Sequence, residues 1–231
     1  MVVKALLFDF NGVIIDDERI QMRVYQQIFA ENGIVMTDEE YLGSLGMDDR
    51  TLVLETFKRA GREIDQNDVL AITELKSSRW RDEIADNLPV FPGVENFIRK
   101  AANEMSLGIV SMSRLDDILY VLERASLTNL FKIIISADEV PLPKPDPTCY
   151  REGFRQLDLA RISEGHAPMV HDDCVVIEDS PPGVRAALAA DLPVLGVPNT
   201  VPAEDLRNAG AMWIAKNLND WWPESIRRAF M

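Results

Sequence analysis

The sequence predicts an α/β protein with a doubly wound parallel sheet and an inserted α-helical cap domain. Short apolar runs without strict alternation end abruptly in polar residues, which is typical of parallel strands covered on both faces. Segments with helical spacing separate these runs, and such alternation predicts helices packed on a parallel sheet. A long stretch without a convincing strand follows the first run, and it is too long to be a simple crossover connection.

Six runs are predicted as strands of one sheet. They cover residues 5–8, 107–110, 132–135, 174–177, 193–197 and 212–214. The helices predicted between them cover residues 93–105, 116–125, 148–157 and 182–190. Ligands of such sheets bind beyond the carboxyl ends of the strands. We therefore expect Asp9, Ser111 and the Glu178-Asp179 pair to lie at one edge of the sheet.

Residues 17–87 are predicted to form the helical cap, and residues 1–16 with 88–231 are predicted to form the α/β catalytic core. Helical patterns in the cap cover residues 19–32, 38–45, 49–60 and 66–84. The segment 87–93 contains two prolines and a glycine, and we expect it to act as a hinge. Trp213, Trp221 and Trp222 near the end of the chain are predicted to be packing residues.

Composition excludes several classes of protein. The chain is 47% hydrophobic and 27% charged, as in ordinary globular proteins, and no apolar run approaches the roughly 18 residues of a membrane span. Two cysteines make neither a disulfide framework nor a zinc site, so a cytoplasmic protein is expected. A net charge of −14 argues against nucleic acid and anionic membranes as partners. We expect a monomer or a weak dimer.

Two segments that follow predicted strands carry candidate chemistry. Asp9 ends the first strand before an Asn-Gly turn, where a carboxylate can act as a nucleophile or a metal ligand. The alternative is an ordinary strand-ending turn. The Ser111 hydroxyl and the Met112 amide follow the next core strand, where they can bind a phosphate. The alternative there is a helix cap by Ser113.

Two further segments add a cation and paired acids. Prolines on both sides stiffen the loop around Lys144, although a lysine in such a loop is often only solvated. Glu178 and Asp179 end a strongly apolar strand, where adjacent carboxylates repel each other unless a cation lies between them. Mg²⁺ prefers such oxygen ligands. The sequence therefore indicates a magnesium site beside a phosphate site.

Taken in order, these four segments resemble those of the haloacid dehalogenase superfamily, and in particular its subgroup of β-phosphoglucomutases and sugar-phosphate phosphatases. The resemblance covers almost the whole chain. It implies that Asp9 attacks phosphorus and becomes an aspartyl-phosphate. It also implies that Mg²⁺ is held by Asp9, by the main-chain carbonyl of Asn11 and by Asp179, with Glu178 binding directly or through water.

The resemblance also implies which residues contact the substrate, a small phosphorylated metabolite. Ser111 and Lys144, helped by the main-chain amide of Met112, are expected to hold the phosphoryl oxygens. In the cap, residues 46–50 are similar to the family's substrate-contacting segment, which makes Arg50 a candidate. Lys76 stands where relatives often carry a cap lysine. We expect these two residues to contact the substrate; the alternative is that both are surface charges.

Asn11 departs from the family pattern. Phosphatases and mutases of the family carry a second aspartate here, which acts as general acid and base. An amide cannot exchange a proton at neutral pH, and such a group contributes on the order of 10²–10⁴-fold in rate. We therefore expect a slow phosphatase, or one restricted to acyl or aryl phosphates. The alternatives are a proton relay through Asp17, a phosphometabolite-binding protein without turnover, a phosphomutase and a dehalogenase.

Overall fold

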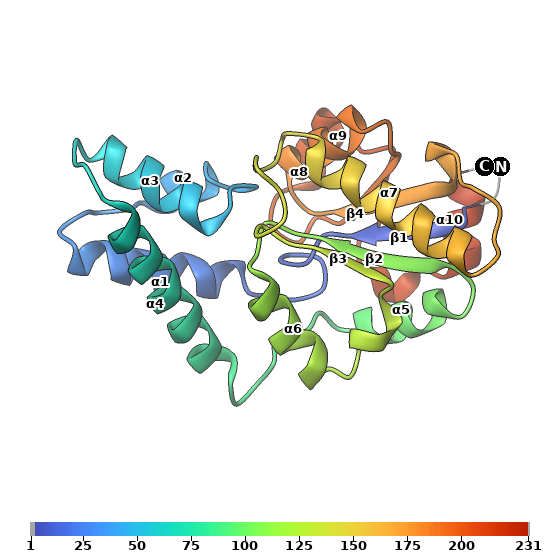
Figure 1. The fold of residues 1–231 in the computed structure, drawn as a ribbon, viewed down its shortest axis with the longest axis horizontal. Helices are drawn as coiled ribbons and strands as arrows, with labels where there is room; N and C mark the ends of the chain where they lie inside the picture. The colour runs from blue at the N-terminus through green and yellow to red at the C-terminus, as the bar shows by residue number, and fades with distance from the viewer. Residues whose placement is uncertain (1–2, 231) are drawn as a thin grey trace.

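A six-stranded parallel sheet forms the centre of the computed structural model, which describes residues 3–230 (Figure 1). The strand order is β3-β2-β1-β4-β5-β6, so the chain winds outward from β1 in both directions. The bounds are β1 (Ala5–Phe8), β2 (Ser106–Val110), β3 (Ile133–Ile135), β4 (Cys174–Glu178), β5 (Val194–Gly196) and β6 (Trp213–Ile214). The predicted fold class is confirmed, and each predicted strand lies within one residue of the observed bounds.

Both faces of the sheet are covered by helices. Leu6 and Phe8 of β1 belong to one apolar cluster, whereas Ala5 and Leu7 belong to another on the opposite face. The first cluster includes residues of α5 (Val94–Ala102), α6 (Leu115–Arg124) and α10 (Pro223–Ala229). The second includes residues of α7 (Thr148–Ser163), α8 (Pro181–Ala189) and α9 (Ala203–Ala209). Because both faces of β1 are buried, its sequence is continuously apolar.

The parallel register aligns the carboxyl ends of the central strands. Phe8 of β1 lies opposite Ile109 of β2 and Ile177 of β4. The residue after Phe8 is Asp9, and the residue after Ile177 is Glu178, so these two carboxylates leave adjacent strands at the same edge. The switch point between β1 and β4 is where ligands of doubly wound sheets bind.

Four helices between β1 and β2 pack around an apolar cluster of their own (Figure 1). They are α1 (Glu18–Glu31), α2 (Asp38–Leu42), α3 (Asp49–Arg59) and α4 (Gln66–Ile84). The cluster includes Tyr25, Phe29, Val53, Phe57 and Ile72. Side-chain caps from Thr37, Asp48 and Asp65 begin α2, α3 and α4. That these helices form a domain bounded at residues 17 and 87 stays a prediction.

Four expectations about the elements need correction. Helix α5 ends at Ala102, three residues before the predicted end. Helix α2 ends at Leu42, three residues before the predicted end, because a turn at Gly43 and Ser44 interrupts it. Helix α7 continues six residues past its predicted end, to Ser163. Trp213 and Trp222 are 47% and 52% exposed, so they are not buried packing residues. Among residues 3–230, no helix has both the length and the apolar character needed to cross a membrane.

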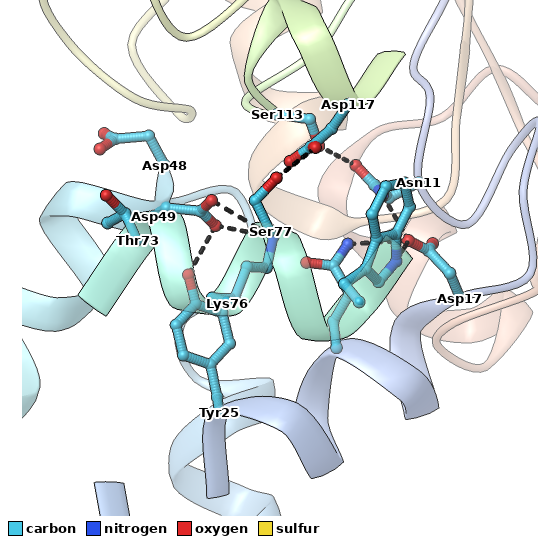
Figure 2. Close-up of polar contacts among 12 residues, drawn as sticks. Asn11, Asp17, Tyr25, Asp48, Asp49, Thr73, Lys76, Ser77, Ser113 and Asp117 are labelled. Atoms are coloured by element: carbon cyan, nitrogen blue, oxygen red, sulfur yellow. Dashed lines mark hydrogen bonds and ion pairs between the residues drawn. The ribbon is translucent and has the colours of Figure 1, made fainter. Parts of the chain in front are cut away.

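One buried carboxylate connects the four-helix unit to the core (Figure 2). Asp117 of α6 is 2% exposed, and its Oδ1 accepts hydrogen bonds from the Ser77 hydroxyl and from Arg81 Nε, the latter at 2.8 Å. Arg81 also forms an ion pair with Asp117 at 2.7 Å. Both donors come from α4, so this contact fixes the position of α4 against α6.

Substituting Asp117 by alanine removes the acceptor from both donors and leaves the Ser77 hydroxyl and the Arg81 guanidinium without their partner. We expect Asp117→Ala to lower the free energy of unfolding by about 2–4 kcal/mol in urea denaturation. The matched control is Asp116→Ala, because Asp116 is exposed on the same helical turn. Equal stability of the two variants would contradict the assigned contact.

Candidate active site

A small pocket lies between the carboxyl edge of the sheet and the helical unit. Its volume is about 70 Å³, the space of a few water molecules. Predicted site residues from the core line it, namely Asp9, Asn11, Ser111, Met112, Lys144 and Asp179. Residues of the helical unit line the opposite wall, among them Glu18, Gln21, Tyr25, Tyr41 and Asp49. The structure therefore brings together side chains that lie more than 170 positions apart in sequence.

Asp9 and Lys144 form a buried ion pair at the base of this pocket. The Asp9 amide donates to the Ile177 carbonyl of β4 at 2.9 Å, which holds the residue in line with the strand. Lys144 Nζ lies 2.9 Å from Asp9 Oδ1 and also donates to the Val110 carbonyl at 3.2 Å. Burial disfavours the charge of Lys144, but Asp9 and Glu178 outweigh it and raise the lysine pKa. Lys144 is therefore a fixed cation beside Asp9.

Glu178 is held by hydrogen bonds on both oxygens. Its Oε1 accepts from Lys144 Nζ at 2.7 Å and from the Tyr150 hydroxyl at 2.9 Å. Its Oε2 accepts from the Asp179 amide and from the amide and hydroxyl of Ser180, at 3.0–3.1 Å. A Cβ at Gly183 would lie 1.8 Å from Oε1, so α8 can approach this carboxylate only with glycine there.

Asp9, Glu178 and Asp179 each place a carboxylate oxygen within 4.8 Å of the others. Burial raises the pKa of Asp9 to about 7 against the opposing effect of Lys144, and Glu178 adds to the increase. Burial, followed by repulsion from Glu178 and Asp9, also raises the pKa of Asp179 well above its usual range. One lysine does not neutralise three carboxylates, so the cluster fits a hard divalent cation.

The turn after β1 is shaped around Asp179. Gly12 has a φ of 71°, and a Cβ there would lie 1.9 Å from Asp179 Oδ2 and 2.6 Å from the Thr200 hydroxyl oxygen. Its carbonyl accepts a hydrogen bond from Asn199 Nδ2 at 2.7 Å. The glycine is therefore required both by the left-handed backbone and by the close carboxylate.

The segment after β2 lines the pocket as predicted, but Ser113 has a different contact. The Ser113 amide donates to the Ser111 hydroxyl oxygen at 3.1 Å, which fixes the turn. Helix α6 begins after Arg114 without a side-chain cap, so the alternative of a cap by Ser113 is wrong. The Ser113 hydroxyl instead donates to Asn11 Oδ1 at 2.5 Å, because the turn directs it toward β1.

Asn11 lies between a hydroxyl donor and a buried carboxylate (Figure 2). Its Nδ2 donates to Asp17 Oδ2 at 2.8 Å, while its Oδ1 accepts from Ser113. The same Asp17 oxygen accepts from Gln21 Nε2 at 3.0 Å and from Trp80 Nε1 at 2.8 Å. Asp17 is fully buried and belongs to no wall of the pocket. The Asn11 amide thus links Ser113 to the buried Asp17.

The two predicted cap contacts differ in their surroundings. Lys76 is 2% exposed and forms an ion pair with Asp49 Oδ1 at 3.0 Å, and the Tyr25 hydroxyl donates to the same oxygen at 2.5 Å (Figure 2). Arg50 is exposed, donates to Gln66 Oε1 at 2.6 Å and lies outside the pocket wall. Substrate contacts by Lys76 and Arg50 stay predictions, and in this conformation Asp49 faces the pocket instead.

Sequence analysis missed several residues of the site. Tyr150 donates to Glu178 and accepts from Lys144 at 3.2 Å, but nothing in the helical pattern of α7 distinguishes it. Asn199 lies in the loop after β5 and had no motif to mark it. Glu18 lies directly after the Asp16-Asp17 pair, and this acidic run was a usable signal.

Replacing Asn11 by aspartate would set two carboxylates against each other at the 2.8 Å contact with Asp17. At pH 7 we expect Asn11→Asp to lower the free energy of unfolding by about 2–4 kcal/mol. In the double variant Asn11→Asp/Asp17→Asn the donor and acceptor are exchanged. Urea denaturation should therefore show the double variant recovering about 1–3 kcal/mol relative to additivity. Strict additivity would mean that the two side chains do not interact.

Comparison with known proteins places this geometry in a family. Residues 6–197 match the family described as haloacid dehalogenase-like hydrolase. The chain is 29% identical over 201 residues to YhcW of Bacillus subtilis (strain 168), covering 86% of this chain and 85% of the relative. It is 25% identical over 219 residues to the phosphorylated carbohydrates phosphatase of Thermotoga maritima, covering 93% and 94%.

The fold is also shared with solved structures. A β-phosphoglucomutase from Clostridium difficile has a TM-score of 0.84 to this chain at 19% identity, covering 99% of this chain and 97% of the other. At that identity the similarity concerns the architecture of sheet and helices. With the family match over residues 6–197, these observations show that the chain belongs to the haloacid dehalogenase-like hydrolases.

Proposed function

We propose that this chain is a magnesium-dependent phosphatase of small phosphorylated metabolites that works through an aspartyl-phosphate on Asp9. The observation that carries the proposal is the ion pair of Lys144 with Asp9, at 2.9 Å, inside a cluster of three carboxylates. The cluster calls for a cation, and the lysine supplies a fixed positive charge for phosphoryl oxygens. The name of the Thermotoga maritima relative, a phosphatase of phosphorylated carbohydrates, supports the substrate class.

The donor set supports a division of labour among the acids. Asp9, Asp179 and the main-chain carbonyl of Asn11 would hold Mg²⁺ directly. Glu178 would act through water, because its two oxygens already accept two and three hydrogen bonds. When bound, the metal would neutralise charge on the phosphoryl group during in-line attack. Lys144, Ser111 and the Met112 amide would orient the phosphoryl oxygens.

The helical unit would close the site during the reaction. The pocket holds only a few water molecules in this conformation, whereas sites for small metabolites have volumes of about 300–1,000 Å³. A substrate would therefore enter only when the helical unit and the core separate. Closure would then exclude bulk water from the aspartyl-phosphate. Residues 17–87 would act as the cap, with a hinge near residues 87–93.

Asn11 bears on which phosphate esters the enzyme can cleave, because a poor leaving group must receive a proton as it departs. Its amide is held between Ser113 and Asp17 and cannot exchange a proton. If no other group supplies the proton, turnover would be restricted to esters with good leaving groups. Phosphomutase activity and phosphometabolite binding without turnover are the competing functions. The carboxylate cluster argues against a metal-independent dehalogenase.

The two cysteines, Cys149 and Cys174, are both free and buried, which fits a protein of the reducing cytoplasm.

The proposal predicts Mg²⁺-dependent phosphate release that requires Asp9. Native protein should hydrolyse p-nitrophenyl phosphate with Mg²⁺, lose activity in EDTA and regain it when Mg²⁺ is restored. Asp9→Asn should be inactive by at least about 10³-fold, because the nucleophile is gone. Asp16→Asn, a change in an exposed carboxylate of the same loop, should behave as native.

Mass spectrometry of acid-quenched native protein should find a phosphoryl group on the peptide that contains Asp9. Phosphate release by Asp9→Asn at the native rate would refute the proposed nucleophile. Binding of phosphate esters without release by the native protein would instead favour the non-catalytic alternative.

Metal titration tests the proposal that Asp179 binds Mg²⁺ directly and Glu178 binds it through water. The Mg²⁺ concentration for half-maximal activity should rise by more than about 100-fold in Asp179→Asn, since a direct ligand is lost. In Glu178→Gln the rise should stay within the 10–100-fold typical of residues that support a ligand. Isothermal titration with Mg²⁺ provides the matching binding constants. The reverse order of the two variants would assign the direct contact to Glu178.

A further inference from the structure

Glu18 is a carboxyl group in the pocket wall that the proposed chemistry does not yet use. It is the first residue of α1 and faces the same cavity of about 70 Å³ as Asp9 and Asn11. The Tyr41 hydroxyl donates to its Oε2 at 2.9 Å, which fixes the side chain from α2. Among the described residues no hydrogen-bond partner occupies Oε1, so this oxygen is left for a ligand.

The other carboxyl groups that line the pocket are already engaged. Asp9 forms an ion pair with Lys144, and Asp179 belongs to the proposed metal site. Asp49 forms an ion pair with Lys76 at 3.0 Å and accepts from Tyr25. Glu18 is the lining acid that takes part neither in an ion pair of the described residues nor in the proposed metal site. It is therefore the acid of this wall that remains able to take up and release a proton.

Asp17 is a poorer source of a proton. It is fully buried, lies outside the pocket wall and accepts three hydrogen bonds on Oδ2. Two pocket-lining side chains contact it, the Asn11 and Gln21 amides, and neither can pass a proton on. The geometry thus favours the neighbouring residue in the chain.

The charges around Glu18 are consistent with a protonated resting state. Burial, followed by the nearby Asp17 and Asp9 carboxylates, raises the pKa of Glu18 to about 8, against the opposing effects of the Tyr41 hydroxyl and Lys76. Glu18 in turn contributes to the raised pKa of Asp179, so it lies near the proposed metal site. Such a carboxyl group carries a proton at neutral pH and can donate it.

We propose that Glu18 is the general acid and base of this enzyme, in place of the side chain at position 11; this inference rests on the phosphatase function proposed above. In the first step Asp9 forms a bond to phosphorus, the ester P–O bond breaks, and the Glu18 proton passes to the leaving alkoxide. In the second step the Glu18 carboxylate removes a proton from water. The water oxygen bonds to phosphorus, the bond to Asp9 breaks, and inorganic phosphate leaves.

Because Glu18 belongs to α1 and its hydroxyl partner Tyr41 to α2, the proton donor is carried by the helical unit and not by the core. Proton transfer would therefore be possible only when that unit is closed over the aspartate. This arrangement separates nucleophile and acid onto the two parts of the chain.

The experiment compares leaving groups in the full chain with Mg²⁺. Glu18→Gln should lower kcat for an alkyl ester such as a hexose 6-phosphate by about 10²–10⁴-fold. The same variant should change the first, aryl-releasing step on p-nitrophenyl phosphate less than about tenfold, measured as a pre-steady-state burst, because p-nitrophenolate needs no proton. The native pH profile for the alkyl ester should fall at alkaline pH as Glu18 loses its proton, and Glu18→Gln should lack that limb.

Two controls keep the result interpretable. Asp16→Asn, an exposed carboxylate two residues earlier, should leave both substrates unaffected. Glu18→Asp keeps an acid on a shorter side chain. This variant should hydrolyse the alkyl ester more slowly and should retain the alkaline limb of the pH profile. It tests the inference even if the glutamine variant unfolds.

Each outcome has a distinct meaning. Native turnover of the alkyl ester that Glu18→Gln preserves would overturn this inference and leave the phosphatase function intact. Equal losses in the first, ester-cleaving step of both esters would assign Glu18 a structural role and also overturn it. Native protein that releases phosphate from neither ester would refute the proposed function and this inference together.

Discussion

A buried ammonium group between two carboxylates is the interaction on which the site depends. Lys144 Nζ lies 2.9 Å from Asp9 and 2.7 Å from Glu178, which end the adjacent strands β1 and β4. Without that cation the two carboxylates would repel each other in a medium that screens charge poorly. The Tyr150 hydroxyl of α7 accepts a hydrogen bond from Lys144 and donates one to Glu178, which holds both side chains in place. Negative charge is thus concentrated at the switch point of the sheet and partly neutralised by Lys144. This is the site that we propose for a metal and a phosphoryl group.

The acids around position 11 explain why an amide there need not end catalysis. Asn11 donates to one oxygen of the buried Asp17 carboxylate and accepts from Ser113, so these contacts order the loop after β1. The carboxylate that relatives of this family place at position 11 has no equivalent there, but Glu18 reaches the pocket from the next helix. Under our proposal the proton donor therefore belongs to the helical unit and not to the core.

Local patterns predicted the fold, and they also named core residues that line one pocket, whose roles stay predictions. Continuous apolar runs gave each strand within one residue, since both faces of the sheet are buried. Polar residues at strand ends led us to expect Asp9, Ser111 and Asp179 at one edge, because parallel strands end there, and flanking prolines marked Lys144. The helical half could not be predicted in the same way. Which lysine or arginine faces the pocket depends on contacts between α1, α3 and α4, and the pairing of Lys76 with Asp49 over 27 positions leaves no local signature.

The central claim is that Asp9 receives the phosphoryl group beside a metal held by Asp179 and a cation supplied by Lys144. A crystal structure of the native chain grown with Mg²⁺ and trifluoroberyllate, an analogue of a phosphoryl group, tests it most directly. The account predicts the analogue on an Asp9 oxygen, Mg²⁺ in contact with Asp9 and Asp179, and Lys144 Nζ within hydrogen-bond distance of a fluorine atom. An analogue bound away from Asp9, or Mg²⁺ bound away from the carboxylate cluster, would contradict it.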